Sequence, residues 1–448
     1  MLNALINPET KRIIDAIGAD NIRFVGGCVR DLIIGRPLKD IDFATTLTPE
    51  QIIERFEYAG IRYLTIGMEH GSITAIYNQN TYDITSLRRD VETNGRHAKI
   101  QYVDDWEIDA ERRDFTINAL YLDAKGKLYD YFGGMDHLRS GKIVFIGDAD
   151  RRIKEDYLRI LRYFRFIGLF GKSDPDDMVA RNCARHGAHI AKLSGERIQS
   201  EMRKILTMQN AVAVLENMKS YGILHFIFPE IVGEEMDFST LANLIKIEPK
   251  PDFLRRLAAI KGYDVTALSE RWKFSSAEQK TLKLIRQGVD FSNPKIALRR
   301  LAPERFIDSV LLTAAEGKLN YNVAEMIEFA ENWQIPKFPI VGKDVLALGL
   351  KEGKTIGNIL MRLEHYWEAN NFHYTREDLL KRLKHEVDEQ LKRDEKEQAA
   401  KLAKEEAAKN IIQNTPKPVV TAEVPKTFGK QPAEIKPKTL KQLPSEGA

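Results

Sequence analysis

Two aspartates separated by one residue could do chemistry. Asp40 and Asp42 lie in the segment KDIDFAT, where alternation of polar and apolar residues predicts a strand with both carboxylates on one face. Two carboxylates so close repel each other unless a cation lies between them, and hard oxygen ligands suit Mg²⁺. The spacing alone is weak evidence, because two further Asp-x-Asp pairs occur later in turn-like contexts. A metal site for in-line phosphoryl transfer is one interpretation, and an ordinary polar strand is the other.

The residues before this pair are suited to binding a phosphate. An apolar run at residues 22–25 leads into Gly26 and Gly27, whose missing side chains let backbone N–H groups approach a phosphate closely. Arg30 follows at the predicted start of a helix. Asp83, in the predicted strand TYDITSL, is either a third carboxylate beside the pair or a surface residue that faces solvent.

Two later segments carry charged side chains at spacings suited to a nucleotide. In residues 109–123, Arg113, Asp114 and Asn118 could bind a triphosphate and ribose hydroxyls, or could form a solvated face. In residues 154–166, helical spacing predicts one ridge that carries Asp156, Arg159, Arg162 and Arg165. These side chains could hydrogen-bond a base edge, although the same spacing also suits ordinary i, i+4 ion pairs.

The elements that must position these residues change in type near residue 150. Up to about residue 145, short β-like runs alternate with one or two helical stretches, which predicts an α/β or α+β domain. Helical periodicity dominates afterwards. The polar run at residues 88–99 is expected to be an exposed mobile loop. We expect a Lys/Glu/Ala-rich helix over about residues 386–410 and a disordered tail after about residue 412.

Composition disfavours several classes of protein. The 448 residues carry 68 Lys and Arg against 65 Asp and Glu, so any nucleic-acid site must come from local clustering of basic residues. With only two cysteines, Cys28 and Cys183, a disulfide scaffold is excluded and a reducing compartment is favoured. No P-loop motif occurs, and no run approaches the roughly 18 apolar residues that span a bilayer. We therefore expect a cytoplasmic protein.

Five groups of motifs follow one another along the first part of the chain: GGCVRD with DID, TYDITSLRRD, ERRDFTINAL, DYFGGMDHL and EDYLRILRYFRF. In this order and spacing they resemble the class II tRNA nucleotidyltransferases, the CCA-adding enzymes of the polymerase β-like superfamily. The resemblance covers about residues 22–206, continues more faintly to the segment around residues 342–349, and does not cover the chain after about residue 390. It implies an α+β fold with a mixed-sheet nucleotidyltransferase head followed by an elongated all-α neck, body and tail.

The resemblance also implies the domain boundaries and the reaction. The expected domains are a catalytic head over 1–145, a base-recognising neck over 146–206, a body over 207–335, a tRNA-binding tail over 336–390, and a charged helix with a disordered Pro/Lys-rich end over 391–448. The implied reaction is template-independent addition of C, C and A to the 3′ end of tRNA from CTP and ATP, with Mg²⁺ and release of pyrophosphate. In the family, the segment at residues 88–99 is a mobile element associated with A addition.

Roles of individual residues are carried over in the same way. Asp40 and Asp42 are expected to hold the metal, with Asp83 as a third catalytic carboxylate. The expected nucleotide-binding residues are Gly26, Gly27, Arg30, Arg113, Asp114, Asn118, Asp156, Arg159, Arg162 and Arg165. Among these, Asp156 and Arg159 would pair with the base of C or A, with support from the last two arginines.

The last expectations concern binding partners and alternative functions. Contacts with tRNA would involve Lys192, Arg197, Arg203, Lys204, Arg299 and Arg300, each of which is at least as well explained as ordinary surface charge. We expect no membrane association and infer no obligate protein partner. The nearest rival is a poly(A) polymerase, which shares the fold but uses ATP alone. The other rival is a non-catalytic RNA-binding relative, which the intact Asp40 and Asp42 disfavour.

Overall fold

The computed structural model describes the following residues: 4–94, 97–229, 231, 236–350 and 353–413. The chain divides into two compact units, Met1–Pro336 and Lys337–Ala448. This division falls next to the expected boundary between body and tail. The other expected domain boundaries stay predictions.

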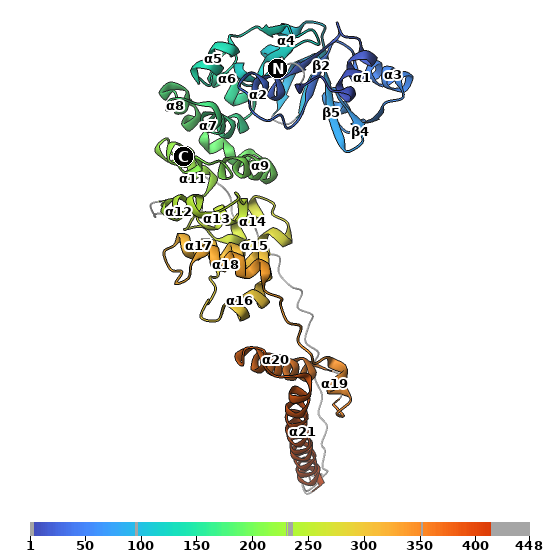
Figure 1. Ribbon diagram of the computed structural model, residues 1–448, viewed down its shortest axis with the longest axis vertical. Coiled ribbons are helices and arrows are strands. Elements are labelled where there is room, and N and C mark those ends of the chain that lie inside the picture. Colours follow the sequence, from blue (N-terminus) through green and yellow to red (C-terminus); the bar gives the residue numbers. More distant parts are fainter. Residues whose placement is uncertain (1–3, 95–96, 230, 232–235, 351–352, 414–448) are drawn as a thin grey trace, which may run out of the picture. The chain divides into compact units, whose positions relative to one another are not determined.

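A seven-stranded mixed sheet forms the core of the N-terminal part of the first unit (Figure 1). Its strand order is β3-β4-β5-β2-β1-β8-β9, in which β2 and β5 are parallel and the other neighbours are antiparallel. The strands are β1 (Ile22–Val25), β2 (Asp42–Thr45), β3 (Arg62–Leu64), β4 (Ser72–Tyr77), β5 (Asn80–Ser86), β8 (Leu120–Leu122) and β9 (Leu128–Asp130). With the helices that follow, the mixed sheet confirms the expected α+β fold class.

Short helices connect and cover these strands. They are α1 (Pro8–Ile17), α2 (Gly27–Ile33), α3 (Pro49–Ala59), η2 (Met68–His70), α4 (Trp106–Glu111), η3 (Thr116–Asn118), α5 (Gly134–Ser140) and α6 (Ala149–Glu155). Sequence signals set their ends: Thr48 and Gln51 form a capping box at the start of α3, and Gly60 ends it in a left-handed conformation at φ 63°.

Alternation along the strands sends side chains into two separate cores. Phe43 and Ile84 are buried in the larger core, together with residues of α1 and α3. Ala44 is buried in a smaller core on the other face, beside residues of α4 and β8. Because strand side chains alternate, Asp42 and Asp83 lie on the face of the smaller core. The fold thus places both carboxylates on the side of the sheet that α4 approaches.

The expected mobile loop at residues 88–99 is wrong over most of its length. Strands β6 (Arg88–Asn94) and β7 (His97–Tyr102) form a separate antiparallel ribbon, with a register shift between Asp90 and Glu92. Main-chain hydrogen bonds hold such a ribbon whatever its side chains are, which is why a polar composition did not reveal it. The two residues between the strands, 95 and 96, lie outside the described residues.

The rest of the first unit is helical, as expected from its periodicity (Figure 1). The helices are α7 (Leu158–Phe170), α8 (Asp177–Arg185), η4 (Gly187–Lys192), α9 (Gly195–Leu206), α10 (Ala211–Ser220), α11 (Leu224–Ile227), α12 (Ser239–Ile247), α13 (Phe253–Ala258), α14 (Val265–Arg271), α15 (Ser276–Arg286), α16 (Pro294–Leu301), α17 (Pro303–Ala315) and α18 (Val323–Asn332). The large core continues from the sheet through α7, α9 and α13. The site is therefore built on one continuous packed framework.

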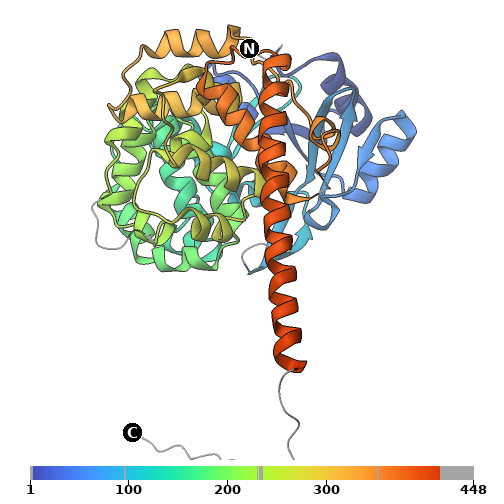
Figure 2. The same cartoon turned by 90° about the horizontal axis from the view of Figure 1, so that it is seen from below.

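The second unit has a core of its own. Its helices are α19 (Gly342–Leu346), α20 (Lys354–Ala369) and α21 (Arg376–Gln413). Leu363 and Trp367 of α20 are buried in this core with Leu379 and Leu383 of α21. Helix α21 is continuous (Figure 2) and includes the helix expected over 386–410. Residues 414–448, expected to be disordered, lie outside the described residues.

No helix in the described part of the chain is long and apolar enough to cross a bilayer. Cys28 and Cys183 are both buried free thiols.

Candidate active site

The turn between β1 and α2 shows why a glycine stands at residue 26. Gly26 has φ 74°, a left-handed conformation that strains most residues with a side chain. A Cβ on it would lie 3.7 Å from Nη1 of Arg113, an ordinary contact, so the backbone conformation and not crowding is the reason for glycine here. Gly27 begins α2, so the expected helix start before Arg30 is confirmed. The chain therefore turns sharply at the point where Arg113 approaches.

Only one carboxylate of the aspartate pair lies in a strand. Strand β2 begins at Asp42, so Asp40 lies in the loop before it, and the expectation of one strand carrying both is wrong. The loop has no strand partner at Asp40, since β1 pairs with β2 only through Phe43, Ala44 and Thr45. Both side chains nevertheless act on each other, as the pKa of Asp42 shows.

Asp42 and Asp83 face each other across the parallel pair β2 and β5, in direct register. Burial and the charges of Asp83 and Asp40 together raise the pKa of Asp42 to about 6, against the opposing effect of Arg113. Asp83 is exposed and accepts a 2.6 Å hydrogen bond from Oγ1 of Thr74. The geometry brings the third candidate carboxylate to the metal pair.

The three carboxylates can hold a hard divalent cation only if water or substrate oxygens complete the coordination shell of that cation. Among the described residues, no three His, Cys, Asp or Glu side chains form a ready-made metal cage. Asp40, Asp42 and Asp83 supply carboxylate oxygens alone, the donor type preferred by Mg²⁺, which commonly takes water and substrate phosphates as its other ligands. The raised pKa of Asp42 means that its negative charge is disfavoured in the fold, and a bound cation would stabilise that charge.

A buried aspartate that the sequence analysis missed orients the Arg112–Arg113 pair. Oδ2 of Asp109 accepts hydrogen bonds from Nη2 of Arg113 at 3.0 Å and from the Tyr121 hydroxyl at 2.8 Å, while Oδ1 pairs with Arg112 at 2.6 Å. Burial alone would raise the pKa of Asp109, but the two guanidinium groups hold it well below its usual range. The i, i+3 and i, i+4 spacing to the two arginines was the available signal.

Four of the expected nucleotide-binding residues form one hydrogen-bonded chain between head and neck. Arg30 donates to Oδ1 of Asn118, whose amide donates to Oδ1 of Asp114 at 3.0 Å. Nε of Arg162, on α7, donates to Oδ2 of Asp114 at 2.7 Å. Burial would raise the pKa of Asp114, yet Arg162 and Asn118 lower it to about 2. The solvated face considered for these residues is therefore excluded.

The expected ridge in the neck is broken at its first member. Asp156 ends α6 with extended dihedral angles, φ −154° and ψ 105°, and α7 begins only at Leu158. Its side chain accepts from the Leu158 N–H at 3.1 Å, a local bond that competes with a continuing helix, and from Nη2 of Arg197 at 2.7 Å. The orientation of the Asp156 side chain is thus set by its ion pair with Arg197 of α9, and not by its position along a helix.

The arginines that follow pair with glutamates of α6 and α9. Nη1 of Arg159 donates to Oε2 of Glu155 at 2.8 Å, so the ordinary i, i+4 pair is present. Nε of Arg165 donates at 2.6 Å to Glu201, a buried residue of α9 that also lies 3.8 Å from Arg162. Glu201 was not among the predicted site residues, and its place beside two arginines depends on how α7 packs on α9.

Comparison with known proteins places this geometry in a family. Family models match two segments: the poly A polymerase head domain over residues 22–144, and the probable RNA and SrmB-binding site of polymerase A over residues 175–233. The CCA tRNA nucleotidyltransferase 1, mitochondrial, of Mus musculus is 34% identical over 398 residues, which is 85% of this chain and 91% of that protein. The chain belongs to the CCA tRNA nucleotidyltransferase family.

Further relatives agree with this assignment. The CCA tRNA nucleotidyltransferase 1, mitochondrial, of Homo sapiens is 36% identical over 386 residues, 81% of this chain and 86% of that protein. The crystal structure of the Bacillus stearothermophilus CCA-adding enzyme in complex with CTP shares the fold, with a TM-score of 0.71 and 24% identity over 87% of this chain and all of that one. Enzymes of this nucleotidyltransferase family generally use a divalent metal, which the three carboxylates fit.

In this family member a buried arginine, Arg152, joins the segment at residues 112–113 to Glu155 of α6. Its guanidinium donates to the backbone carbonyl of Arg112 at 2.5 Å and to that of Arg113, and it pairs with Glu155. Glu155 in turn holds Arg159. Burial, together with the charge of Arg159, lowers the pKa of Arg152 to about 10. The sequence analysis did not select Arg152, which lies one turn of helix before Glu155.

Several residues of the nucleotidyltransferase that are expected to contact tRNA also form ion pairs or hydrogen bonds within the protein. Arg197 pairs with Asp156, and Arg203 pairs with Glu278 at 2.6 Å across two helices. Nε of Arg299 donates to the carbonyl of Pro336. Lys192 is exposed. Contact of these residues with tRNA stays a prediction.

Proposed function

We propose that this chain adds C, C and A in turn to the 3′ end of tRNA, using CTP and ATP with Mg²⁺. The observation that carries the proposal is the 34% and 36% identity to CCA tRNA nucleotidyltransferases over more than four-fifths of the chain. The site geometry supports it, because the three carboxylates, the hydrogen-bonded chain from Arg30 to Arg162, and the pair Asp156 and Arg159 all lie in the first unit.

The chemistry is a single displacement at phosphorus. The 3′-oxygen of the RNA attacks the α-phosphorus of the nucleotide, and a new phosphodiester bond forms. The bond from the α-phosphorus to the α,β-bridging oxygen breaks, its electron pair leaves with pyrophosphate, and the hydroxyl proton passes to solvent. Mg²⁺ held by Asp40, Asp42 and Asp83 would lower the pKa of the attacking hydroxyl and neutralise charge on the leaving group. The protein itself positions both substrates and needs no nucleophile.

Asp156 and Arg159 would choose the base. A carboxylate accepts from the exocyclic amine of C or A, and a guanidinium donates to the ring acceptor beside it. G and U present a carbonyl in place of that amine, which leaves the half-buried carboxylate of Asp156 without its hydrogen-bond donor. The ion pair from Arg197 to Asp156 and that from Glu155 to Arg159 hold the pair ready for this contact.

Incorporation from each labelled nucleotide onto three tRNA transcripts tests the proposal. The transcripts end before CCA, after C and after CC, and each is incubated with one nucleoside triphosphate and Mg²⁺. We expect two additions from CTP, one from ATP onto the CC end, and then a stop. No incorporation from any nucleotide would contradict the proposal and favour an RNA-binding relative without chemistry.

The descriptions of the matching family models keep poly(A) polymerase as the second candidate. The same experiment separates the two, since a poly(A) polymerase would extend all three transcripts with long tails from ATP alone. The helical domains would hold the acceptor stem and elbow of the tRNA through phosphates and 2′-hydroxyls. Cytoplasmic location and action without an obligate protein partner are further parts of the proposal.

A further inference from the structure

Asp156, the carboxylate that would read the base, lies at a break between the helices α6 and α7. The break consists of Asp156 and Tyr157, and Tyr157 has dihedral angles of φ −62° and ψ −15°. Oδ1 of Asp156 accepts from the N–H of Leu158, two residues further on, and this hydrogen bond closes a turn around Tyr157. The direction of the Asp156 carboxylate therefore depends on how Tyr157 is held.

An imidazole ring holds the side chain of Tyr157. Its phenol ring is stacked on the ring of His189 in η4, with the ring centroids 4.6 Å apart and the planes inclined by 19°. Both residues are half-buried. Stacked rings attract each other in a defined geometry, so the contact restricts the movement of the Tyr157 side chain and of the backbone that carries it.

The segment that carries His189 is itself anchored to α6 and to α11. Nε2 of His186, the residue before η4, donates to Oδ1 of Asp150 on α6 at 2.7 Å. Between the two histidines, Gly187 packs so closely on Phe226 that a Cβ would lie 2.4 Å from its ring. One short segment thus contacts α6 before the helix break and the tyrosine within it.

The contribution of His189 comes from its ring. Nδ1 of this imidazole is buried and forms no hydrogen bond with the residues that the structure describes. A buried nitrogen without a partner lowers stability, so this atom does not account for the presence of a histidine. Phenylalanine, which has a ring without that nitrogen, should be able to take its place in the stack.

We propose that Tyr157 is a positioning residue for base recognition, and that its stack on His189 keeps the Asp156 carboxylate directed at the exocyclic amine of the incoming C or A. The ion pair with Arg197 holds Oδ2 of Asp156, whereas the turn around Tyr157 holds Oδ1. A carboxylate that is free to turn would select less sharply between an amine and a carbonyl. The inference rests on the proposed function and adds a residue that acts through Asp156.

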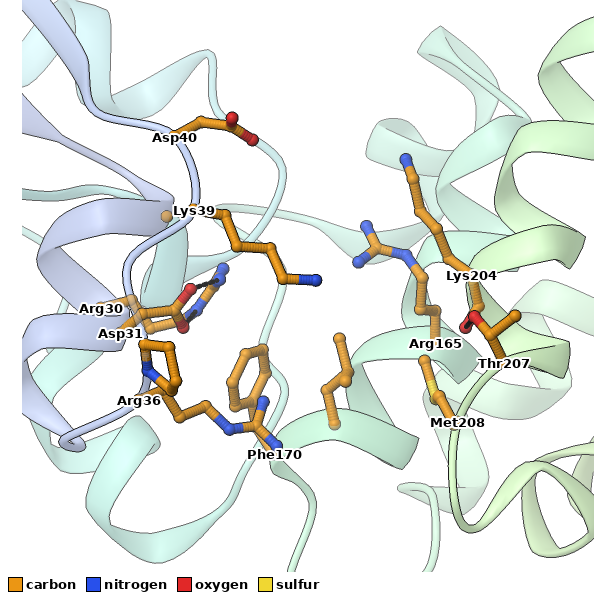
Figure 3. Close-up of a pocket in the computed structure, with 13 residues that line it drawn as sticks. Arg30, Asp31, Arg36, Lys39, Asp40, Arg165, Phe170, Lys204, Thr207 and Met208 are labelled. Carbon is orange, nitrogen blue, oxygen red and sulfur yellow. Dashed lines mark hydrogen bonds and ion pairs between the residues drawn. The ribbon is translucent and has the colours of Figure 1, made fainter. Parts of the chain in front are cut away.

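The stack is separate from the residues expected to hold phosphates and metal. A cavity of about 590 Å³ beside Arg30 and Asp40 extends to Arg165 of α7 (Figure 3). Tyr157 and His189 are not among the described residues that line this cavity. A substitution in the stack should therefore change the selection between bases without removing a contact to the phosphates.

Substitutions that remove or keep the stacked ring test the assignment. Tyr157→Leu and His189→Leu remove it, whereas Tyr157→Phe and His189→Phe keep it. Forward addition to a tRNA transcript that ends before CCA gives kcat/KM for CTP and for UTP. We expect each leucine variant to lower the ratio of kcat/KM for CTP to that for UTP about tenfold, with the KM for tRNA unchanged. Tyr58→Leu, which changes a 96% exposed tyrosine of α3, is the control and should leave the ratio as it is.

The phenylalanine variants should keep the ratio of the unsubstituted protein. His189→Phe should also melt at a higher temperature, because no buried nitrogen is then left without a partner. Loss of the ratio in the phenylalanine variants would overturn the assignment, since the stacked ring would not be the cause. A lower melting temperature of the leucine variants with an unchanged ratio would overturn it as well, because the stack would then serve stability alone.

Titration of the full chain with CTP and with UTP, followed by calorimetry, measures base selection without catalysis. The ratio of the two dissociation constants should fall in both leucine variants and stay the same in both phenylalanine variants. An unsubstituted protein that prefers CTP in this titration but incorporates no nucleotide would contradict the proposed function alone. The leucine variants would then still decide the assignment through their dissociation constants.

Discussion

At the scale of single residues, Asp42 carries a charge that the folded protein disfavours. It is partly buried, lies in register with Asp83, and has its pKa raised to about 6 by burial and by the neighbouring carboxylates. A group in this state costs stability when it is ionised and regains that stability when a cation binds. Its position is explained by catalysis and not by folding.

Asp42→Asn should therefore separate activity from stability. Removal of the metal ligand is expected to lower incorporation by at least about a thousandfold. In the absence of metal, the same variant should be more stable by about 1 kcal/mol, because the disfavoured charge is gone. Asp15→Asn, an exposed aspartate of α1, is the matched control and should change neither quantity. An Asp42→Asn protein that still incorporates nucleotides would contradict the metal assignment.

The pKa of Asp42 also predicts a pH dependence. Between the usual value of 3.8 and about 6, the folded protein holds a proton that the unfolded chain has released, so the free energy of unfolding falls as pH rises through this window. Mg²⁺ competes with that proton and should raise the melting temperature more at a pH of about 7.5 than at about 5. Melting curves with and without Mg²⁺ measure this, and Asp42→Asn should lose the difference. An equal shift at both pH values would count against the prediction.

At the scale of elements, the site depends on contacts between the segment at residues 112–114, α6 and α7. Arg152 links the first two through backbone carbonyls, and Asp114 links the segment to Arg162. Such bonds fix the distance between residues that would hold phosphates and residues that would read the base. Orientation of this kind is how a protein without a nucleophile accelerates phosphoryl transfer.

Arg152→Met should destabilise the protein and disturb nucleotide binding together. It leaves two carbonyls and Glu155 without their buried partner, at a cost of about 3 kcal/mol. We also expect the KM for CTP to rise, since Arg159 shares Glu155 with Arg152. The neighbouring Arg151→Met is the control: it also removes an ion pair to Glu155, but from a side chain that is 79% exposed, so it should cost much less stability. Denaturant unfolding and initial rates measure both effects.

If Arg152 acts only through general stability, Arg152→Met would change the melting temperature but leave the KM for CTP as it was. Partial rescue of that KM by Arg152→Lys, which keeps the charge but loses the forked geometry, would support a positioning role.

At the scale of the whole molecule, the chain consists of two units with separate cores. The buried side chains of the second unit come from the range Ile340–Val387, whereas the sheet and the neck share one core in the first. The candidate site residues all lie in the first unit. Truncation after residue 336 should therefore separate catalysis from the proposed binding of distant parts of the tRNA.

A chain of residues 1–336 should fold and keep its affinity for CTP while losing affinity for tRNA. Its cores remain complete, so a cooperative melting transition is expected. Loss of the phosphate contacts proposed for the second unit should raise the KM for tRNA about tenfold or more. A chain of residues 1–413 serves as the control and should behave as the full chain. An unchanged KM for tRNA in the shorter chain would remove the second unit from tRNA binding.

Local patterns in the sequence determined which residue types stand at the site. The Gly26-Gly27 turn, the helix that carries Arg30, and the alternation that places Asp83 on one strand face follow from rules acting over a few residues. The Asn-Gly pair near residue 95 was also a hairpin signal of this local kind, although the polar composition around it favoured a loop.

Only the tertiary structure decided which side chains meet. The parallel pairing of β2 with β5 sets Asp42 against Asp83, and the packing of α9 on α7 brings Glu201 to Arg165. The ion pair from Arg197 fixes Asp156 at a helix break that periodicity could not foresee. Such contacts join residues dozens of positions apart, and their energies depend on burial and charge in the assembled fold. Short-range sequence rules contain neither quantity.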